Sequence, residues 1–147
     1  MRKSTAGFTF LEVLTVITIG AFLAIGVAKA GQWVSFNSKI IQLQNDVNTL
    51  RAGVQQWKMS NGAMVGIEVE KLTEVAMLPE VWGDGTGMSP WLGDYTIANN
   101  ALIPGAFDVV VTEIPNEAVA KRMQSYFGET LLSSSYATGS LLLKFAD

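Results

Sequence analysis

The stretch that decides the fold is Phe8-Thr-Phe-Leu-Glu12-Val-Leu-Thr-Val-Ile-Thr-Ile-Gly20-Ala-Phe-Leu-Ala-Ile-Gly26-Val-Ala28. These 21 residues carry a single charge, on Glu12. A helix of this length extends roughly 30 Å, which matches the hydrocarbon core of a bilayer. We therefore predict a membrane-spanning helix. Because a carboxylate in such a helix costs on the order of 3 kcal/mol unless it finds a partner, Glu12 is a candidate functional residue.

The pattern changes after Gly31, where large apolar side chains recur at alternating intervals of three and four residues. This spacing places them along one face of a helix. They are Trp33, Phe36, Ile40, Leu43, Val47, Leu50, Val54 and Trp57. No proline interrupts the segment and Asn61-Gly62 provides a helix stop, so one helix is predicted from Phe8 to Ser60, on the order of 80 Å long. The stripe suits either a coiled-coil seam or a core face, and its bulky aromatic residues favour packing against a sheet.

The rest of the chain predicts a small globular head. We expect a short helix over residues 67–76 and strands over residues 95–97, 107–112 and 141–145. A further helix is predicted to begin after Asn116, its N-cap, and to stop at Gly128, with an apolar face of Val119, Met123, Tyr126 and Phe127. We expect the tail, residues 129–147, to be held by the last strand alone. The predicted class is α+β, with a long N-terminal helix, half transmembrane and half amphipathic, packed on a small antiparallel sheet.

Composition excludes several classes of function. The chain of 147 residues has no cysteine and no histidine, so it lacks the thiolate, the commonest general base and the commonest zinc ligand. Its net charge is −3 and its basic residues do not cluster, so no nucleic-acid partner is suggested. The glycine-rich stretch Gly83–Gly87 lacks the lysine of a phosphate loop, and Asp84 alone is a poor calcium ligand set. We therefore expect no catalytic residue, metal or cofactor, and we do not expect an enzyme.

The N-terminus carries a family resemblance. A short leader with Arg2 and Lys3 ends in Gly7, and Phe8 is followed four residues later by Glu12 within the apolar run. This order resembles the precursor of a type IV pilin or pseudopilin, with the class III signal read by prepilin peptidase. The resemblance implies cleavage after Gly7, methylation of the new amine of Phe8, and a role for Glu12 in filament assembly.

The resemblance also implies an organisation and a set of partners. Residues 1–7 would be the leader, residues 8–30 the transmembrane and filament-core helix, and residues 31–147 a pilin-like head that includes the amphipathic half of the helix. The precursor would sit in the inner membrane as a single-pass protein with its N-terminus in the cytoplasm, and then join an extracellular pilus or fimbrium. Its partners would be copies of itself, prepilin peptidase, a platform protein, an assembly ATPase and an outer-membrane secretin.

The head is similar to that of type IVb pilins. The similarity rests on Leu78-Pro79, Ser89-Pro90-Trp91-Leu92-Gly93, the strand at residues 107–112, and Ile114-Pro115 before a helix. This chain departs from that pattern because it has no cysteines to join the helix to the C-terminal region, and because Leu92 stands where a second glycine is common.

Two alternatives to a main filament subunit remain open. One is a minor pilin or pseudopilin of a type II secretion, DNA-uptake or conjugation machine. The other is a periplasmic or secreted binding domain, because Ala28-Lys29-Ala30 resembles the site of an ordinary signal peptide cut after Ala30. A separate hypothesis concerns Gly20, Gly26 and Gly31, which weaken the helix and are expected to let it loosen in a filament.

Overall fold

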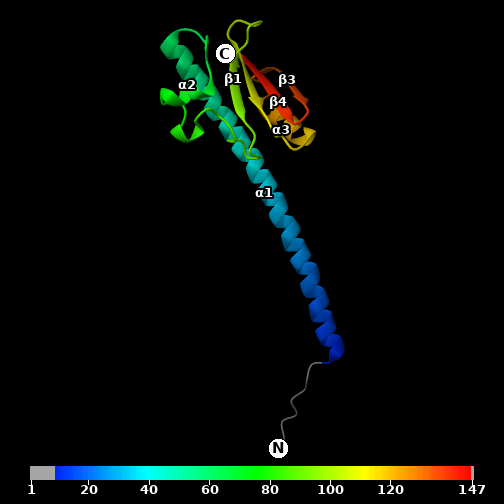
Figure 1. The fold of residues 1–147 in the computed structure, drawn as a ribbon. Helices are drawn as coiled ribbons and strands as arrows, with labels where there is room; N and C mark the ends of the chain where they lie inside the picture. The colour runs from blue at the N-terminus through cyan, green and yellow to red at the C-terminus, as the bar shows by residue number, and fades with distance from the viewer. Residues whose placement is uncertain (1–8, 147) are drawn as a thin grey trace, which may run out of the picture. The chain divides into compact units, whose positions relative to one another are not determined.

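The computed structural model describes residues 9–146 of the chain. Figure 1 shows its elements in chain order: helix α1 (Phe10–Asn61), helix α2 (Val69–Glu74), the 3₁₀ helix η1 (Glu80–Trp82), strands β1 (Tyr95–Asn99) and β2 (Ala106–Val111), helix α3 (Glu117–Phe127), and strands β3 (Leu131–Ala137) and β4 (Ser140–Ala146). The chain divides into two compact units, one ending at Ser38 and one beginning at Lys39. We call the second unit the head.

The first unit is the apolar part of α1. Among the described residues, α1 is the one helix that is long and apolar enough to cross a membrane, with a mean hydropathy of 2.3 over 18 residues, none of them buried. Its two threonine hydroxyls are satisfied within the helix, because Thr15 donates to the carbonyl oxygen of Leu11 and Thr18 to that of Leu14, each at 2.8 Å. Polar groups bonded in this way can enter lipid without an unmet hydrogen bond.

The head contains a four-stranded sheet in the order β1-β2-β4-β3, and every neighbouring pair is antiparallel. Strands β2 and β4 lie at the centre and read Ala-Phe-Asp-Val-Val-Val and Ser-Leu-Leu-Leu-Lys-Phe-Ala. Branched and aromatic side chains of this kind favour strands. Alternate residues of β4, namely Leu141, Leu143 and Phe145, are fully buried, so one face of the sheet forms the core. The predicted α+β, pilin-like architecture is confirmed.

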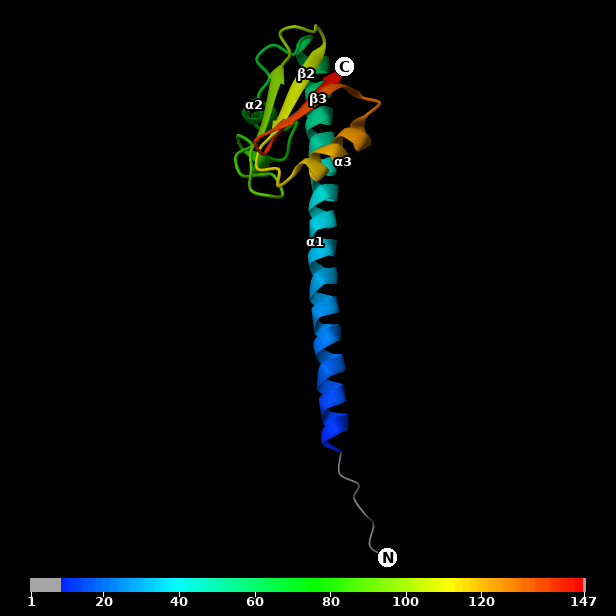
Figure 2. The same cartoon turned by 90° about the vertical axis from the view of Figure 1, so that its right-hand side faces the viewer.

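The part of α1 within the head lies along the buried face of the sheet (Figures 1 and 2). Its buried stripe agrees with the prediction over most of its length and consists of Ile40, Leu43, Val47, Leu50 and Val54. Helix α3 packs on the same face, because the ring of Phe127 meets that of Phe145 edge-on at 5.5 Å. The predicted N-cap of α3 is also confirmed, since Asn116 Oδ1 accepts a hydrogen bond from Val119 N at 3.1 Å.

The prediction for the tail was wrong. Residues 131–137 form a strand, β3, which pairs with β4 and has one register shift between Leu131 and Ser133. The two strands are joined by the two-residue turn Thr138-Gly139, with φ values of 51° and 77°. The hairpin was not predicted because apolar and polar residues do not alternate clearly in Leu-Leu-Ser-Ser-Ser-Tyr-Ala. In addition, Thr-Gly is not the asparagine-glycine pair that usually signals a two-residue hairpin turn. The tail is therefore held by a hairpin and not by its last strand alone.

Three smaller predictions also differ from the structure. Trp33 is 67% exposed and lies in the first unit, so the buried stripe begins later than predicted. The helix predicted over residues 67–76 is shorter and spans only Val69–Glu74; it could not have reached Ala76, whose φ of 57° lies outside the right-handed helical region. Tyr126, which was predicted to lie on the apolar face of α3, is 54% exposed. Its ring meets that of Phe127 edge-on, and its hydroxyl accepts a hydrogen bond from Asn48 Nδ2 at 3.4 Å.

Candidate assembly site

Glu12 lies in the first turn of α1, where it is bonded reciprocally to Thr9. The main-chain N and the Oγ1 of Thr9 both donate to Glu12 Oε2, at 2.8 and 3.0 Å. In return, Glu12 N donates to Thr9 Oγ1 at 3.3 Å. This arrangement is a capping box, in which a threonine and a glutamate three residues later satisfy each other's main-chain donors.

The capping box gives the carboxylate a partner within its own chain. The first turn of a helix has unpaired N–H groups and a positive end of the helix dipole, and both stabilise a carboxylate. The sequence interpretation looked for the partner of Glu12 in the amine that cleavage would create on Phe8, and not in Thr9. The spacing Thr9-Phe10-Leu11-Glu12 matches the capping-box signature, so this signal was present in the sequence and was missed.

The second carboxylate oxygen, Oε1, differs from Oε2 in its contacts with the described residues. Within residues 9–146, no hydrogen bond or ion pair involves Glu12 Oε1. A carboxylate offers about four acceptor positions on its two oxygens. Glu12 can therefore cap its own helix through Oε2 and still accept a donor from another molecule through Oε1.

The other two predicted site residues, Gly7 and Phe8, lie outside the described residues. Cleavage after Gly7 and methylation of Phe8 therefore stay predictions. The same holds for the role of Glu12 in assembly, which concerns contacts between chains.

From Phe10 to Ala28, the exposed surface of α1 is apolar apart from Glu12, Thr15 and Thr18. The exposed large apolar side chains of the first unit are Phe10, Leu11, Val13, Leu14, Val16, Ile17, Ile19, Phe22, Leu23, Ile25, Val27, Trp33 and Val34. An apolar surface of this extent needs lipid or other helices to cover it. The helix continues through Gly20, Gly26 and Gly31, and a Cβ at any of them would meet no atom within 4 Å. Whether these glycines let the helix loosen in a filament stays a prediction.

In the head, a partly buried polar contact joins α1 to strand β1. The hydroxyl of Tyr95 donates to Asp46 Oδ2 at 2.9 Å, and the Tyr95 ring stacks on Trp82 at 5.1 Å. Burial raises the pKa of the Asp46 carboxyl, and the Tyr95 hydrogen bond partly opposes this. Burial, together with the nearby Asp46 charge, also raises the pKa of the Tyr95 hydroxyl, which stays protonated. No periodicity in the sequence indicated this pair, because its members lie on different elements.

A cation lies against the aromatic core. The guanidinium carbon of Arg51 is 4.6 Å from the ring centre of Phe145 and 5.7 Å from that of Phe127. Burial lowers the pKa of this guanidinium. Contacts of this kind stabilise a cation by roughly 0.5–2 kcal/mol, depending on how far water is excluded. Arg51 therefore helps to hold α1, α3 and β4 together.

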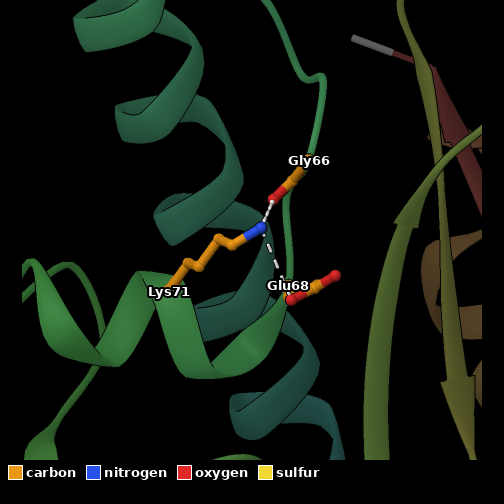
Figure 3. A network of polar contacts seen from close by, with 3 residues as sticks. All are labelled: Gly66, Glu68 and Lys71. Atoms are coloured by element: carbon orange, nitrogen blue, oxygen red, sulfur yellow. Dashed lines mark hydrogen bonds and ion pairs between the residues drawn. The ribbon is translucent and has the colours of Figure 1, made fainter.

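The connection from α1 to β1 has an acidic surface that does not form a metal site. Figure 3 shows how it is fixed, with Lys71 Nζ donating to the carbonyl oxygen of Gly66 at 2.9 Å and pairing with Glu68 at 3.5 Å. A hollow nearby is lined by Glu70, Thr73, Glu74, Ala76, Leu78, Glu80, Gly83 and Asp84. Within the described part of the chain, no three acidic, histidine or cysteine side chains are arranged to hold a metal ion. The best interpretation of this surface is a solvated face.

Comparison with known proteins bears on the N-terminus. The family model for the prokaryotic N-terminal methylation motif matches residues 2–28. This motif is the class III signal of type IV pilins. No curated protein and no solved structure matches the chain.

The motif and the architecture together support a type IV pilin-like precursor. They imply processing by a prepilin peptidase and self-assembly. The motif and the apolar half of α1 also fit a precursor anchored in the inner membrane. These features point to a structural protein.

Proposed function

We propose that this chain is a structural subunit of an extracellular type IV pilus, cut after Gly7 and assembled through α1. The observation that carries the proposal is the methylation motif at residues 2–28, which coincides with a capped carboxylate at the start of an apolar helix. The motif predicts where a new amine forms. The capping box holds Glu12 near the same end of the helix.

The mechanism follows from the chemistry of that amine. Cleavage after Gly7 leaves a positive N-terminal amine on Phe8, which is methylated. When a new subunit enters the filament, Glu12 of one copy pairs with the amine of Phe8 on a neighbour. Each charge then offsets the cost of burying the other. Because Thr9 already binds Oε2, the amine of the neighbour binds Oε1, and the carboxylate keeps a fixed direction.

The membrane supplies the subunits. Before assembly, lipid covers the apolar surface of the first unit. A platform protein driven by an ATPase extracts the subunit, and the apolar surfaces of neighbouring copies replace the lipid. A secretin in the outer membrane then lets the growing filament leave the cell.

The surface of α1 within the head supports this proposal. The charged residues of this part of α1, Lys39, Asp46, Arg51 and Lys58, are all partly buried. Its exposed residues from position 41 onward carry no charge and are Ile41, Gln42, Asn45, Ala52, Gln55, Gln56, Met59, Ser60 and Asn61. A helix face that meets water is normally charged. An exposed face without charge fits a surface that neighbouring copies cover.

The test is a pair of variants compared in a host that assembles the fibre. Glu12→Ala should insert into the membrane normally and be cut normally, but it should yield few fibres. The matched control is Glu117→Ala, which removes a surface carboxylate paired with Lys121 at 3.0 Å and should leave the fibre yield unchanged. Normal yield from Glu12→Ala would contradict the proposed role of this residue.

Mass spectrometry of the mature N-terminus separates the main proposal from a secreted binding domain. A pilin subunit should begin at methylated Phe8, whereas an ordinary signal peptide would leave Gly31. The structure favours the first outcome, because α1 runs without interruption through Ala30 and Gly31. The share of this chain in sheared surface fibres then distinguishes a main subunit from a minor pilin or pseudopilin.

A further inference from the structure

Leu92 occupies an unusual position in a tight turn of the head. The turn begins at Ser89, whose carbonyl oxygen accepts from Leu92 N at 2.8 Å and whose Oγ accepts from Gly93 N at 2.8 Å. Leu92 has a φ of 64°, in the left-handed region that favours glycine. The turn is closely packed, because Ser89 is buried and because a Cβ at Gly93 would collide with the carbonyl group of Thr112.

Leucine at this position is unfavourable for the isolated head in two ways. Its backbone conformation is strained for any residue with a Cβ. Its side chain is also 81% exposed, so it buries little surface within its own chain. Strain that a fold does not compensate locally is a reason to look for a function.

The opposite end of the head carries a hollow whose lining is mostly apolar but also includes Lys58, Asn99 and Asn100. The hollow has a volume of about 340 Å³. Its lining includes Val65, Asn99, Ala101 and Pro104. Next to Ala101 in the chain is Leu102, which is 87% exposed, and Val65 is 76% exposed.

The topology places these two features at opposite ends of the head. Strand β1 runs from Tyr95 to Asn99, so Leu92 lies before its start and the hollow lies beyond its end. The same order holds along α1. Lys39, where the head begins, lies 5.9 Å from the ring centre of Trp91, whereas Lys58 and Gly62 at the end of α1 line the hollow.

We propose that Leu92 of one copy inserts into the hollow beside Leu102 on a second copy. This inference rests on the proposed function, because it is a contact within the pilus. A contact between two different patches of the same chain is heterologous, and it repeats without closing when all copies share one orientation. A polymer of that kind brings one end of each head against the opposite end of another. Burial of Leu92 in the assembly then offsets its exposure in the free subunit.

The first test uses cysteine cross-linking, which the cysteine-free chain makes specific. The double variant Leu92→Cys/Leu102→Cys should give a ladder of disulfide-linked multimers in fibres sheared from producing cells. Each single variant should give no ladder, because neither residue meets its own copy. The matched control is Leu132→Cys/Leu102→Cys, in which Leu132 is an exposed leucine on β3 and should not form the ladder.

The second test separates the contact from the stability of the head. Leu92→Gly removes the side chain and relieves the strained backbone, so the melting temperature should not fall. Fibre yield should nevertheless drop severalfold. Leu92→Met keeps an apolar side chain and should retain most of the yield.

The outcomes also distinguish this inference from the proposed function. If the unaltered chain forms fibres but the double cysteine variant gives no ladder, the contact is absent and the inference is overturned. Normal yield from Leu92→Gly would overturn it as well. If the unaltered chain is found in no fibre, the proposed function itself fails.

Discussion

Replacing Tyr95 with phenylalanine tests how the sheet is joined to α1. The change removes one hydroxyl, which donates to Asp46 Oδ2 at 2.9 Å. It keeps the ring, which is buried and stacked on Trp82 at 5.1 Å. The variant therefore isolates the hydrogen bond from the packing.

The expected loss follows from the charge of the acceptor. A hydrogen bond to a charged group contributes roughly 1.5–3 kcal/mol to stability. Asp46 is only partly buried, so water can replace some of the lost bond. We therefore expect Tyr95→Phe to lower the free energy of unfolding by about 1–2 kcal/mol at neutral pH.

The loss should depend on pH. Burial raises the pKa of Asp46 above its ordinary value of 3.8, so the folded state holds this proton more tightly than the unfolded chain does. The stability that Asp46 contributes is therefore full below that value and is lost as the pH rises through the folded pKa. Removing the Tyr95 hydrogen bond raises the folded pKa further, because that bond favours the charged form. The deficit of Tyr95→Phe should thus be larger at neutral pH than at about pH 4.

The assay is urea unfolding of the full chain in detergent micelles, followed by tryptophan fluorescence. Trp82 reports directly on this region because it stacks on Tyr95. Tyr126→Phe is the matched control, since it removes an exposed hydroxyl with a longer hydrogen bond of 3.4 Å and should change stability little. An equal deficit for Tyr95→Phe at both pH values, or none at neutral pH, would refute this reasoning.

Two further predictions concern turns. Thr138→Asn should raise the free energy of unfolding by roughly 0.5–1 kcal/mol, because Thr138 has a φ of 51° in a two-residue hairpin where asparagine is preferred; a lower urea midpoint would contradict this. Gly93→Ala should lower the free energy of unfolding by about 2 kcal/mol or more, because the new Cβ would lie 2.8 Å from Glu113 Cβ and collide with the Thr112 carbonyl group. A variant as stable as the original chain would show that this turn can shift.

Local patterns explain which parts of the fold were predictable. The apolar run, the helical stripe and the Asn116 cap are short-range signals, because they depend on spacing within one element. The strands at the centre of the sheet were also predicted, since their branched residues favour that conformation. Strand β3 was missed because its serines carry little local preference, and only pairing with β4 makes it a strand.

The same division holds for the candidate site. The sequence alone determined the methylation motif and the position of Glu12, because both depend on a short run of residues. The capping box of Glu12 with Thr9 is encoded just as locally, but it was recognised only in the structure. Only the tertiary structure decided that Asp46 meets Tyr95, that Arg51 lies over two rings, and that Leu92 is exposed in a left-handed conformation. These facts join residues far apart in the chain or depend on how a turn is packed. The spacing of residues along the sequence does not tell which distant residues will meet, nor how a turn will pack.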